Sequence, residues 1–248
     1  MRTIHATRYV TPLREGGSLP AIVEADDCGL YVLKFRGAGQ GPLALVAELI
    51  AGETGRALGL AVPEIVLMEL DPALGRNEPD AEIRELLNSS AGLNLALDYL
   101  PGSVMFDPAA CDSVDAATAS RAVWFDAFVT NIDRTARNPN LLWWHRKLYF
   151  IDHGASLYFH HDWQNLDKKA LNPFAAIKDH VLLKWASEIA SVDSTALNEA
   201  FFNDVLRQVP DAWLEGVKHA EYAEFLTRRL EAQALFVEEA LRARAAIV

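Results

Sequence analysis

The stretch from residue 124 to residue 154 restricts the fold of this chain more than any other. An apolar helix is predicted to lead into a polar loop that holds Asp133 and, five residues later, Asn138. A hairpin is predicted over residues 141–151, and it ends on Asp152-His153-Gly154. Because a hairpin returns the chain to its starting point, the two polar loops at its ends are expected to lie side by side.

The residue types in these two loops are typical of phosphoryl transfer. One carboxylate can accept a hydroxyl proton, while the amide and the second carboxylate hold magnesium, which prefers oxygen ligands. Spacing favours Asn138 as the metal ligand, with Asn140 as the alternative. Each element is common in turns when it stands alone. The prediction therefore depends on the conjunction of Asp133, Asn138, the hairpin, and Asp152 at 19 residues beyond Asp133.

The N-terminal part of the chain supplies a candidate phosphate-binding lysine. Lys34 lies in a predicted strand that forms a hairpin with residues 21–24, and Glu48 lies on the helix that follows. Such a pair can hold the α- and β-phosphates of a nucleotide. Glu53 is an alternative partner for Lys34, and a lysine at an exposed sheet edge is the plainer interpretation.

A glycine-containing loop precedes this hairpin. Gly16 and Gly17 can bring backbone N–H groups near a phosphate, although a simple surface turn explains them equally well. Ser18, which follows them, is either a turn former or a site of self-phosphorylation. This loop is the candidate phosphate loop of the chain.

The order of predicted elements indicates an α+β protein with two lobes. A small antiparallel sheet with one helix is predicted over residues 1–100, and a larger, mainly helical lobe over residues 101–248. The predicted strand over residues 95–100 marks the seam between them. Nucleotide-binding kinases have this layout, with the ligand in the cleft.

Composition excludes several other classes of protein. Lys and Arg number 23 against 34 Asp and Glu, and the net charge of −11 disfavours general binding to nucleic-acid phosphates. Cys28 and Cys111 are too few for a disulfide scaffold or a zinc finger. The N-terminus lacks the apolar core of a signal peptide, and no apolar run reaches 18 residues, so a cytoplasmic protein without a membrane span is expected.

Two polar clusters outside these loops are predicted to be structural. His160 and His161 are expected in a strand, where adjacent side chains point to opposite faces, so no transition-metal site is expected there. Arg228 and Arg229 lie in a predicted helix that also carries several Glu residues. They are expected to form a solvated face and not a nucleic-acid patch.

At these residues the sequence resembles the HipA-like kinase family, a bacterial branch of the protein-kinase-like fold that is related in motif style to the phosphoinositide kinases. The similarity covers roughly residues 8–185. It is most specific in Tyr31-Val32-Leu33-Lys34-Phe35, in Asn131-Ile132-Asp133 with Asn138, and in Ile151-Asp152-His153-Gly154. The resemblance implies a kinase that uses ATP and magnesium to phosphorylate a Ser or Thr hydroxyl of a protein. The substrates of the family are often translation-linked, and some members are toxins paired with an antitoxin.

The resemblance also implies a role for each residue of the site. Lys34 would contact phosphate, and Glu48 would position Lys34. Asp133 would be the general base of the reaction. Asn138 and Asp152 would bind magnesium.

The nucleobase and the substrate are less closely defined by the resemblance. By its position at the seam, the segment Asp98, Tyr99 and Leu100 would be the hinge whose backbone meets the adenine edge. The better-known HipA toxins carry Gly where this chain has Thr130, and Arg134 directly follows the base, as in phosphoinositide kinases. A kinase of a small molecule or lipid headgroup is therefore an alternative function. A nucleotide-binding pseudokinase scaffold without turnover is another.

Overall fold

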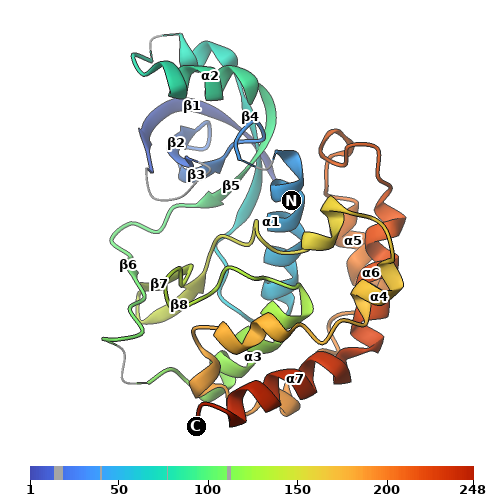
Figure 1. Cartoon of the computed structure of the whole chain (residues 1–248). Helices are drawn as coiled ribbons and strands as arrows, with labels where there is room; N and C mark the ends of the chain where they lie inside the picture. The colour runs from blue at the N-terminus through green and yellow to red at the C-terminus, as the bar shows by residue number, and fades with distance from the viewer. Residues whose placement is uncertain (14–18, 40, 77, 111–112) are drawn as a thin grey trace.

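The computed structural model of the chain describes residues 1–13, 19–39, 41–76, 78–110 and 113–248. The protein is α+β, as the sequence predicts. Most strands gather at one end of the molecule and most helices at the other (Figure 1). Two hydrophobic cores accompany this arrangement, one inside the N-terminal sheet and a larger one among the helices.

Five strands near the N-terminus form a closed barrel. In barrel order they are β1 (Thr3–Pro12), β2 (Ala21–Ala25), β3 (Leu30–Lys34), β5 (Gly92–Asp98) and β4 (Ile65–Leu70). Neighbouring strands are antiparallel, except that β1 and β4 run parallel in the register Thr3↔Leu67. The predicted hairpin of β2 and β3 is confirmed by this pairing.

The barrel differs from the small antiparallel sheet that the sequence predicts. The difference is β1, which pairs with β2 on one side and with β4 on the other and so leaves neither strand with a free edge. Only Ile4 and Ala6 of this strand are buried, and the rest of it is exposed or half-buried. Its sequence therefore lacks the apolar alternation by which a strand is found.

The pleat of β3 separates its side chains into two sets. Tyr31 and Leu33 are buried in the barrel core. Because successive side chains of a strand point to opposite faces, Lys34 lies outside that core. The same alternation places Leu95 and Leu97 of β5, which pair with Lys34 and Val32, in the larger core.

Helix α1 (Pro42–Ala57) runs from the barrel into the larger core (Figure 1). It begins with proline in its first turn, where no intrahelical N–H is needed, and ends before Gly59, whose φ of 78° is accessible to glycine. Eleven of its residues are buried, on more than one face. A helix that is buried on several sides is held between other elements.

Helix α2 (Ala81–Ser89) connects β4 to β5 and contributes Ile83 and Leu87 to the barrel core. The other helices and a second sheet form the C-terminal part of the chain. The helices are α3 (Ala116–Phe128), α4 (Leu166–Ala170), α5 (Glu199–Leu206), α6 (His219–Glu231) and α7 (Gln233–Ala245). The sheet contains β6 (Val104–Met105), β7 (Leu141–Trp144) and β8 (Lys147–Phe150), in that order. The predicted hairpin is thus confirmed as β7 and β8, and a hydrogen bond of 2.8 Å from Phe150 N to Ala61 O attaches it to the loop after α1.

Two predictions about polar clusters are wrong in part, namely the strand expected at His160 and the exposure expected for Arg229. Residues Tyr158–His161 form a 3-10 helix, not a strand, and the buried His160 contacts the hydroxyl of Tyr222 through Nδ1 at 3.2 Å. Arg229 is fully buried and not part of a solvated face. It donates hydrogen bonds to the carbonyl oxygens of the α3 end and of the α4 end, which are those of Ala127, Phe128, Ala170 and Asn172.

Among the described residues, no helix combines the length and apolar character needed to cross a lipid bilayer.

A buried tryptophan links the C-terminal part to the barrel. Trp213 is 0% exposed, and its Nε1 donates to the carbonyl of Leu93 in β5 at 3.2 Å. Trp213→Phe removes this hydrogen bond and part of a buried ring, so we expect the free energy of unfolding to fall by about 2 kcal/mol. Urea unfolding followed by circular dichroism measures it.

Trp144→Phe is the matched control for this change. Trp144 also donates through Nε1 to a carbonyl, that of Pro101 at 2.9 Å, but it is half-exposed. Its replacement is expected to cost less than about 1 kcal/mol. Equal losses for the two variants would contradict the importance of the buried contact.

Candidate active site

Lys34 joins three parts of the chain through its ammonium group. Nζ donates to Glu48 Oε2 of α1 at 2.6 Å and to Asp152 Oδ1, beyond β8, at 2.5 Å. Lys34 therefore pairs with Glu48 and not with Glu53, whose carboxylate lies 3.8 Å from Arg56 Nε. The three side chains differ in burial: Glu48 is 0%, Lys34 13% and Asp152 47% exposed. The carboxylate of Asp152 is thus the one that solvent, or a cation, can reach.

The loop after β8 also holds Glu48 in place. The backbone N–H of His153 donates to Glu48 Oε2 at 2.8 Å, and His153 Nδ1 lies 3.2 Å from Oε1. Burial alone would raise the pKa of Glu48, but Lys34 and His153 hold it at about 2. Burial likewise would lower the pKa of Lys34, and the charges of Asp152 and Glu48 raise it above its usual value instead. The pair is ionised at neutral pH.

The loop between α3 and β7 brings together the predicted base and the predicted metal ligand. Asn138 Nδ2 donates to Asp133 Oδ2 at 2.8 Å. Asn140 lies further inside, with Nδ2 at 3.4 Å from the same oxygen and 3.5 Å from the Asp152 carbonyl. Asn140 therefore lies between the two loops, whereas the side chain of Asn138 is exposed. The sequence-based expectation that the loops adjoin is confirmed by these contacts.

A buried ionic cluster under this loop was missed in the sequence. Asp126 of α3 accepts hydrogen bonds from Arg134 Nε at 2.6 Å, from His180 Nε2 at 2.9 Å and from Asn131 Nδ2 at 2.9 Å. Asp126 and Arg134 are both 0% exposed in their side chains. The available signal was an aspartate inside the apolar run Trp124–Phe128, since a buried carboxylate in a helix needs a partner.

Arg134 does not face a substrate. Besides pairing with Asp126, its Nη1 donates to the carbonyl of Asn140 at 2.6 Å and approaches that of Ile151 at 3.3 Å. The guanidinium is enclosed by the protein. The position of Arg134 after the base therefore gives no support to recognition of a lipid headgroup.

Three residues at or next to the site have a strained backbone. Thr130, Asn140 and Asp152 have φ values of 54°, 49° and 55°, in the left-handed region that non-glycine residues rarely adopt. Thr130 is β-branched and occupies the position where the better-known HipA toxins have glycine. Such positions cost about 1–3 kcal/mol each and persist where the surroundings enforce them.

The predicted hinge is partly closed to a ligand. The N–H of Asp98 donates to the carbonyl of Glu64 at 2.9 Å, and that of Tyr99 to the carbonyl of Leu30 at 3.0 Å. An adenine at this position would have to use the N–H of Leu100 or the backbone carbonyls. The predicted phosphate-loop residues Gly16, Gly17 and Ser18 lie outside the described part of the chain.

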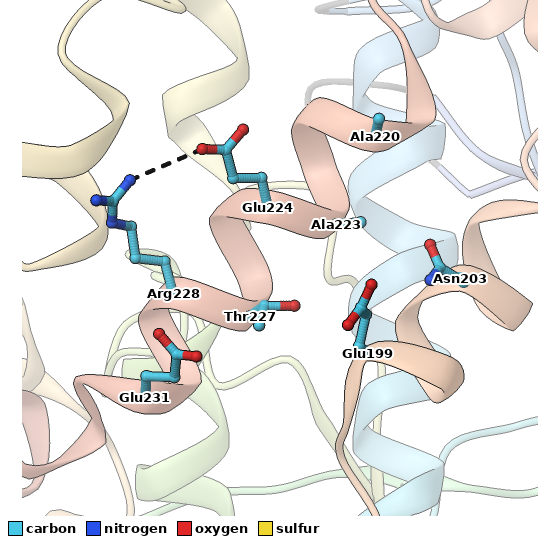
Figure 2. A pocket seen from close by; sticks show the side chains of 8 residues that line it. All are labelled: Glu199, Asn203, Ala220, Ala223, Glu224, Thr227, Arg228 and Glu231. Atoms are coloured by element: carbon cyan, nitrogen blue, oxygen red, sulfur yellow. Dashed lines mark ion pairs between the residues drawn. The ribbon is translucent and has the colours of Figure 1, made fainter.

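A separate groove of about 490 Å³ lies between α5 and α6 (Figure 2). Its walls carry Glu199, Glu224 and Glu231, and Arg228 pairs with Glu224 across one turn of α6 at 3.7 Å. Of the predicted site residues that the structure describes, none lines this groove. The two loops that carry the predicted site and this groove are therefore separate parts of the molecule.

Comparison with known proteins identifies the family. The sequence matches the family model of the HipA-like kinases over residues 7–239, so the chain belongs to the HipA-like kinase family. The resemblance seen in the sequence is confirmed. A search of curated protein sequences gave no match.

Solved structures show the same class of fold. The chain is similar to the Helicobacter pylori proinflammatory kinase CtkA, with a TM-score of 0.57 and 13% identity over 99% of each chain. It is also similar to the Golgi casein kinase, with a TM-score of 0.48 and 9% identity, and to that kinase with Mn/ADP bound, with 0.49 and 10%. In both cases 100% of this chain and 75% of the other are covered. The similarity to CtkA shows a protein-kinase-like fold.

The ionisation of Glu48 predicts how stability depends on pH. Its pKa is about 2 in the folded protein against an ordinary value of 4.5, so the ionised group stabilises the fold above pH 4.5. This contribution is lost as the pH falls from about 4.5 to about 2. The difference corresponds to about 3 kcal/mol. Urea unfolding of the wild type and of Glu48→Gln at pH 6 and pH 3 measures the part of this loss that occurs above pH 3, about 2 kcal/mol.

Glu48→Gln has no carboxylate to protonate, so its stability should fall less between the two pH values than that of the wild type. Glu238→Gln serves as the control, because Glu238 is an exposed residue of α7, far along the chain from the buried pair. It should keep the acid sensitivity of the wild type. An identical pH dependence in Glu48→Gln and the wild type would contradict the buried ion pair.

Proposed function

We propose that this member of the HipA-like kinase family is an ATP- and Mg²⁺-dependent phosphotransferase that phosphorylates a Ser or Thr hydroxyl of a protein. One observation carries the proposal. Lys34 is paired with both Glu48 and the partly exposed Asp152, and Asn140 connects that cluster to the adjoining Asp133 and Asn138. A lysine, a base and two oxygen ligands are the parts that phosphoryl transfer requires.

The donor set fits a hard divalent cation. Asp152 presents a carboxylate that is 47% exposed, and Asn138 is exposed with its amide nitrogen committed to Asp133, which leaves the carbonyl oxygen for a cation. Mg²⁺ is usually held by one or two protein oxygens together with substrate phosphates. Asn138 and Asp152 would hold it here. When bound, it would neutralise charge on the phosphate oxygens.

The protein's own residues would then divide the remaining work. The ammonium of Lys34 would bind phosphate oxygens, and Glu48 keeps that ammonium in place. Asp133 would accept the proton of the substrate hydroxyl as its oxygen attacks the γ-phosphorus and ADP departs. Asn138 orients Asp133 through the contact to Oδ2. Positioning and charge neutralisation, not a covalent intermediate, would lower the barrier.

A protein substrate is supported by the family resemblance. The alternative of a small-molecule or lipid-headgroup kinase loses one of its two supports, because Arg134 is enclosed and bonded to Asp126 and backbone carbonyls, while the compact size of the chain still fits it. By family resemblance, the substrate is translation-linked and an antitoxin is a candidate partner. The net charge of −11 makes a nucleic-acid partner unfavourable. The exposed free thiol of Cys28 fits a reducing, cytoplasmic location.

Substitution of the two acidic residues separates catalysis from binding. Asp133→Ala removes the base, so phosphate transfer should fall by at least about 100-fold while Mg²⁺-dependent binding of an ATP analogue stays within about threefold of the wild type. Asp152→Ala should abolish the Mg²⁺ dependence of binding. Calorimetry with and without Mg²⁺, together with transfer from γ-labelled ATP to lysate proteins, measures both.

Glu224→Gln in the separate groove is the control, and it should leave binding and transfer unchanged. Three outcomes would contradict the proposal in different ways. Label that appears only in lipids or small molecules would establish the small-molecule kinase, and binding without any transfer would establish the scaffold. Full activity in Asp133→Ala would show that another residue is the base.

A further inference from the structure

We propose that Asp126 is a positioning residue that holds two loops, one with each carboxylate oxygen. They are the base loop, residues 131–140, which carries Asp133, and the metal loop, residues 151–154, which carries Asp152. The inference rests on the proposed function, since it concerns how Asp133 and Asp152 are kept in register. Asp126 contacts neither residue directly. It acts through Asn131 on one side and through Arg134 on the other.

The first branch leads from Oδ1 to the base. Asn131 Nδ2 donates to Asp126 Oδ1 at 2.9 Å, and the Asn131 N–H donates to the Asp126 carbonyl at 2.9 Å. Asn131 Oδ1 in turn accepts from the N–H of Asp133 at 3.0 Å. Because both ends of the Asn131 amide are bonded, its orientation is set by Asp126. The backbone of the base is thus tied to the helix α3 by two successive hydrogen bonds.

The second branch leads from Oδ2 to the metal loop. Arg134 Nε donates to Oδ2 at 2.6 Å, and Nη1 of the same guanidinium donates to the carbonyl of Asn140 and reaches that of Ile151 at 3.3 Å. Ile151 directly precedes Asp152. The Ile151 N–H donates back to the Asn140 carbonyl at 3.1 Å. One planar guanidinium therefore spans the two strands that lead into and out of the hairpin.

His180 completes the cluster from a third direction. The N–H of Leu182 donates to His180 Nδ1 at 3.1 Å, so Nδ1 is the unprotonated nitrogen and Nε2–H donates to Asp126 Oδ2 at 2.9 Å. The same segment pairs with the base loop, because Thr135 and His180 form a β-bridge and Val181 N donates to the Arg134 carbonyl at 3.1 Å.

The burial of this cluster argues that its geometry is specific. Asp126 and Arg134 are fully enclosed, and a buried charge that loses its partner is strongly destabilising. Burial alone would raise the pKa of Asp126, but Arg134 and His180 hold it at about 2, so the carboxylate remains ionised at neutral pH. The hydrogen bonds of the cluster can all form only when the base loop and the metal loop are both in place.

The two branches predict separable effects on kinetics. Asn131→Ala breaks only the first branch, so kcat should fall about 10- to 100-fold with the Mg²⁺ concentration for half-maximal rate unchanged. Arg134→Lys keeps the positive charge but removes the Nη1 donor to the carbonyls of Asn140 and Ile151. The Mg²⁺ concentration for half-maximal rate should therefore rise about fivefold or more, with a smaller change in kcat. Asp126→Asn should show both effects.

A merely structural role is tested by Arg229→Lys. Arg229 is equally buried and also bonds carbonyls at the end of α3, yet it touches neither loop. This variant should lose thermal stability like the others while its kcat and Mg²⁺ dependence stay within about twofold of the wild type. If kcat and Mg²⁺ dependence of all four variants follow thermal stability alone, the positioning role is overturned.

A second measurement does not depend on activity. Hydrogen exchange by NMR reports the protection of the Asp133 amide, whose N–H donates to Asn131. Protection should fall about tenfold or more in Asn131→Ala and Asp126→Asn and stay unchanged in Arg229→Lys. An inactive wild type with these exchange results would overturn the proposed kinase function alone. Unchanged protection in Asn131→Ala would overturn the inference, and this holds even if Asp126→Asn fails to fold.

Discussion

The ammonium of Lys34 is the point at which three distant parts of the chain meet. Its partners Glu48 and Asp152 stand 14 and 118 positions away in the sequence. An ion pair this enclosed is costly to desolvate and is retained only with close geometry and further hydrogen bonds, which His153 supplies to Glu48. The barrel must therefore present Lys34 on its outer side, and α1 and the end of the hairpin must each bring a carboxylate, Glu48 and Asp152, to the same ammonium.

Three of the left-handed backbone positions of the chain lie at or next to the base loop and the metal loop. Thr130 comes just before the base loop, Asn140 ends it, and Asp152 follows the hairpin, so each left-handed residue lies at a change of chain direction. At each of these positions the neighbouring residues are anchored. Asp126 bonds Asn131 after the first, and the Asn140 carbonyl accepts from Ile151 and Arg134. The conformational cost is thus offset by contacts that come from other elements.

Several residues of the candidate site could be predicted from the sequence, but the tertiary contacts that hold them in place could not. Asp133 and Asp152 belong to short motifs whose spacing places them on adjoining loops, and Lys34 ends a strand of a predicted hairpin. The barrel closure was missed because β1 is mostly polar outside Ile4 and Ala6. The occupied amide of Tyr99 was missed for a different reason, since its acceptor, the Leu30 carbonyl, is set by tertiary packing that periodicity does not report.

The formal charges of the site residues and of the buried Asp126–Arg134 pair beneath them indicate what the site can bind. Together they contain four carboxylates and two cations, which gives a formal net charge of −2. The carboxylates are those of Glu48, Asp126, Asp133 and Asp152, and the cations are Lys34 and Arg134. The charge of Arg134 is neutralised by Asp126, and Lys34 is shared between the carboxylates of Glu48 and Asp152. A triphosphate entering alone would therefore meet more negative than positive charge. Only a divalent cation shared with the exposed oxygens of Asp152 and Asn138 would reverse that balance, which is the physical reason to expect nucleotide and metal to bind together.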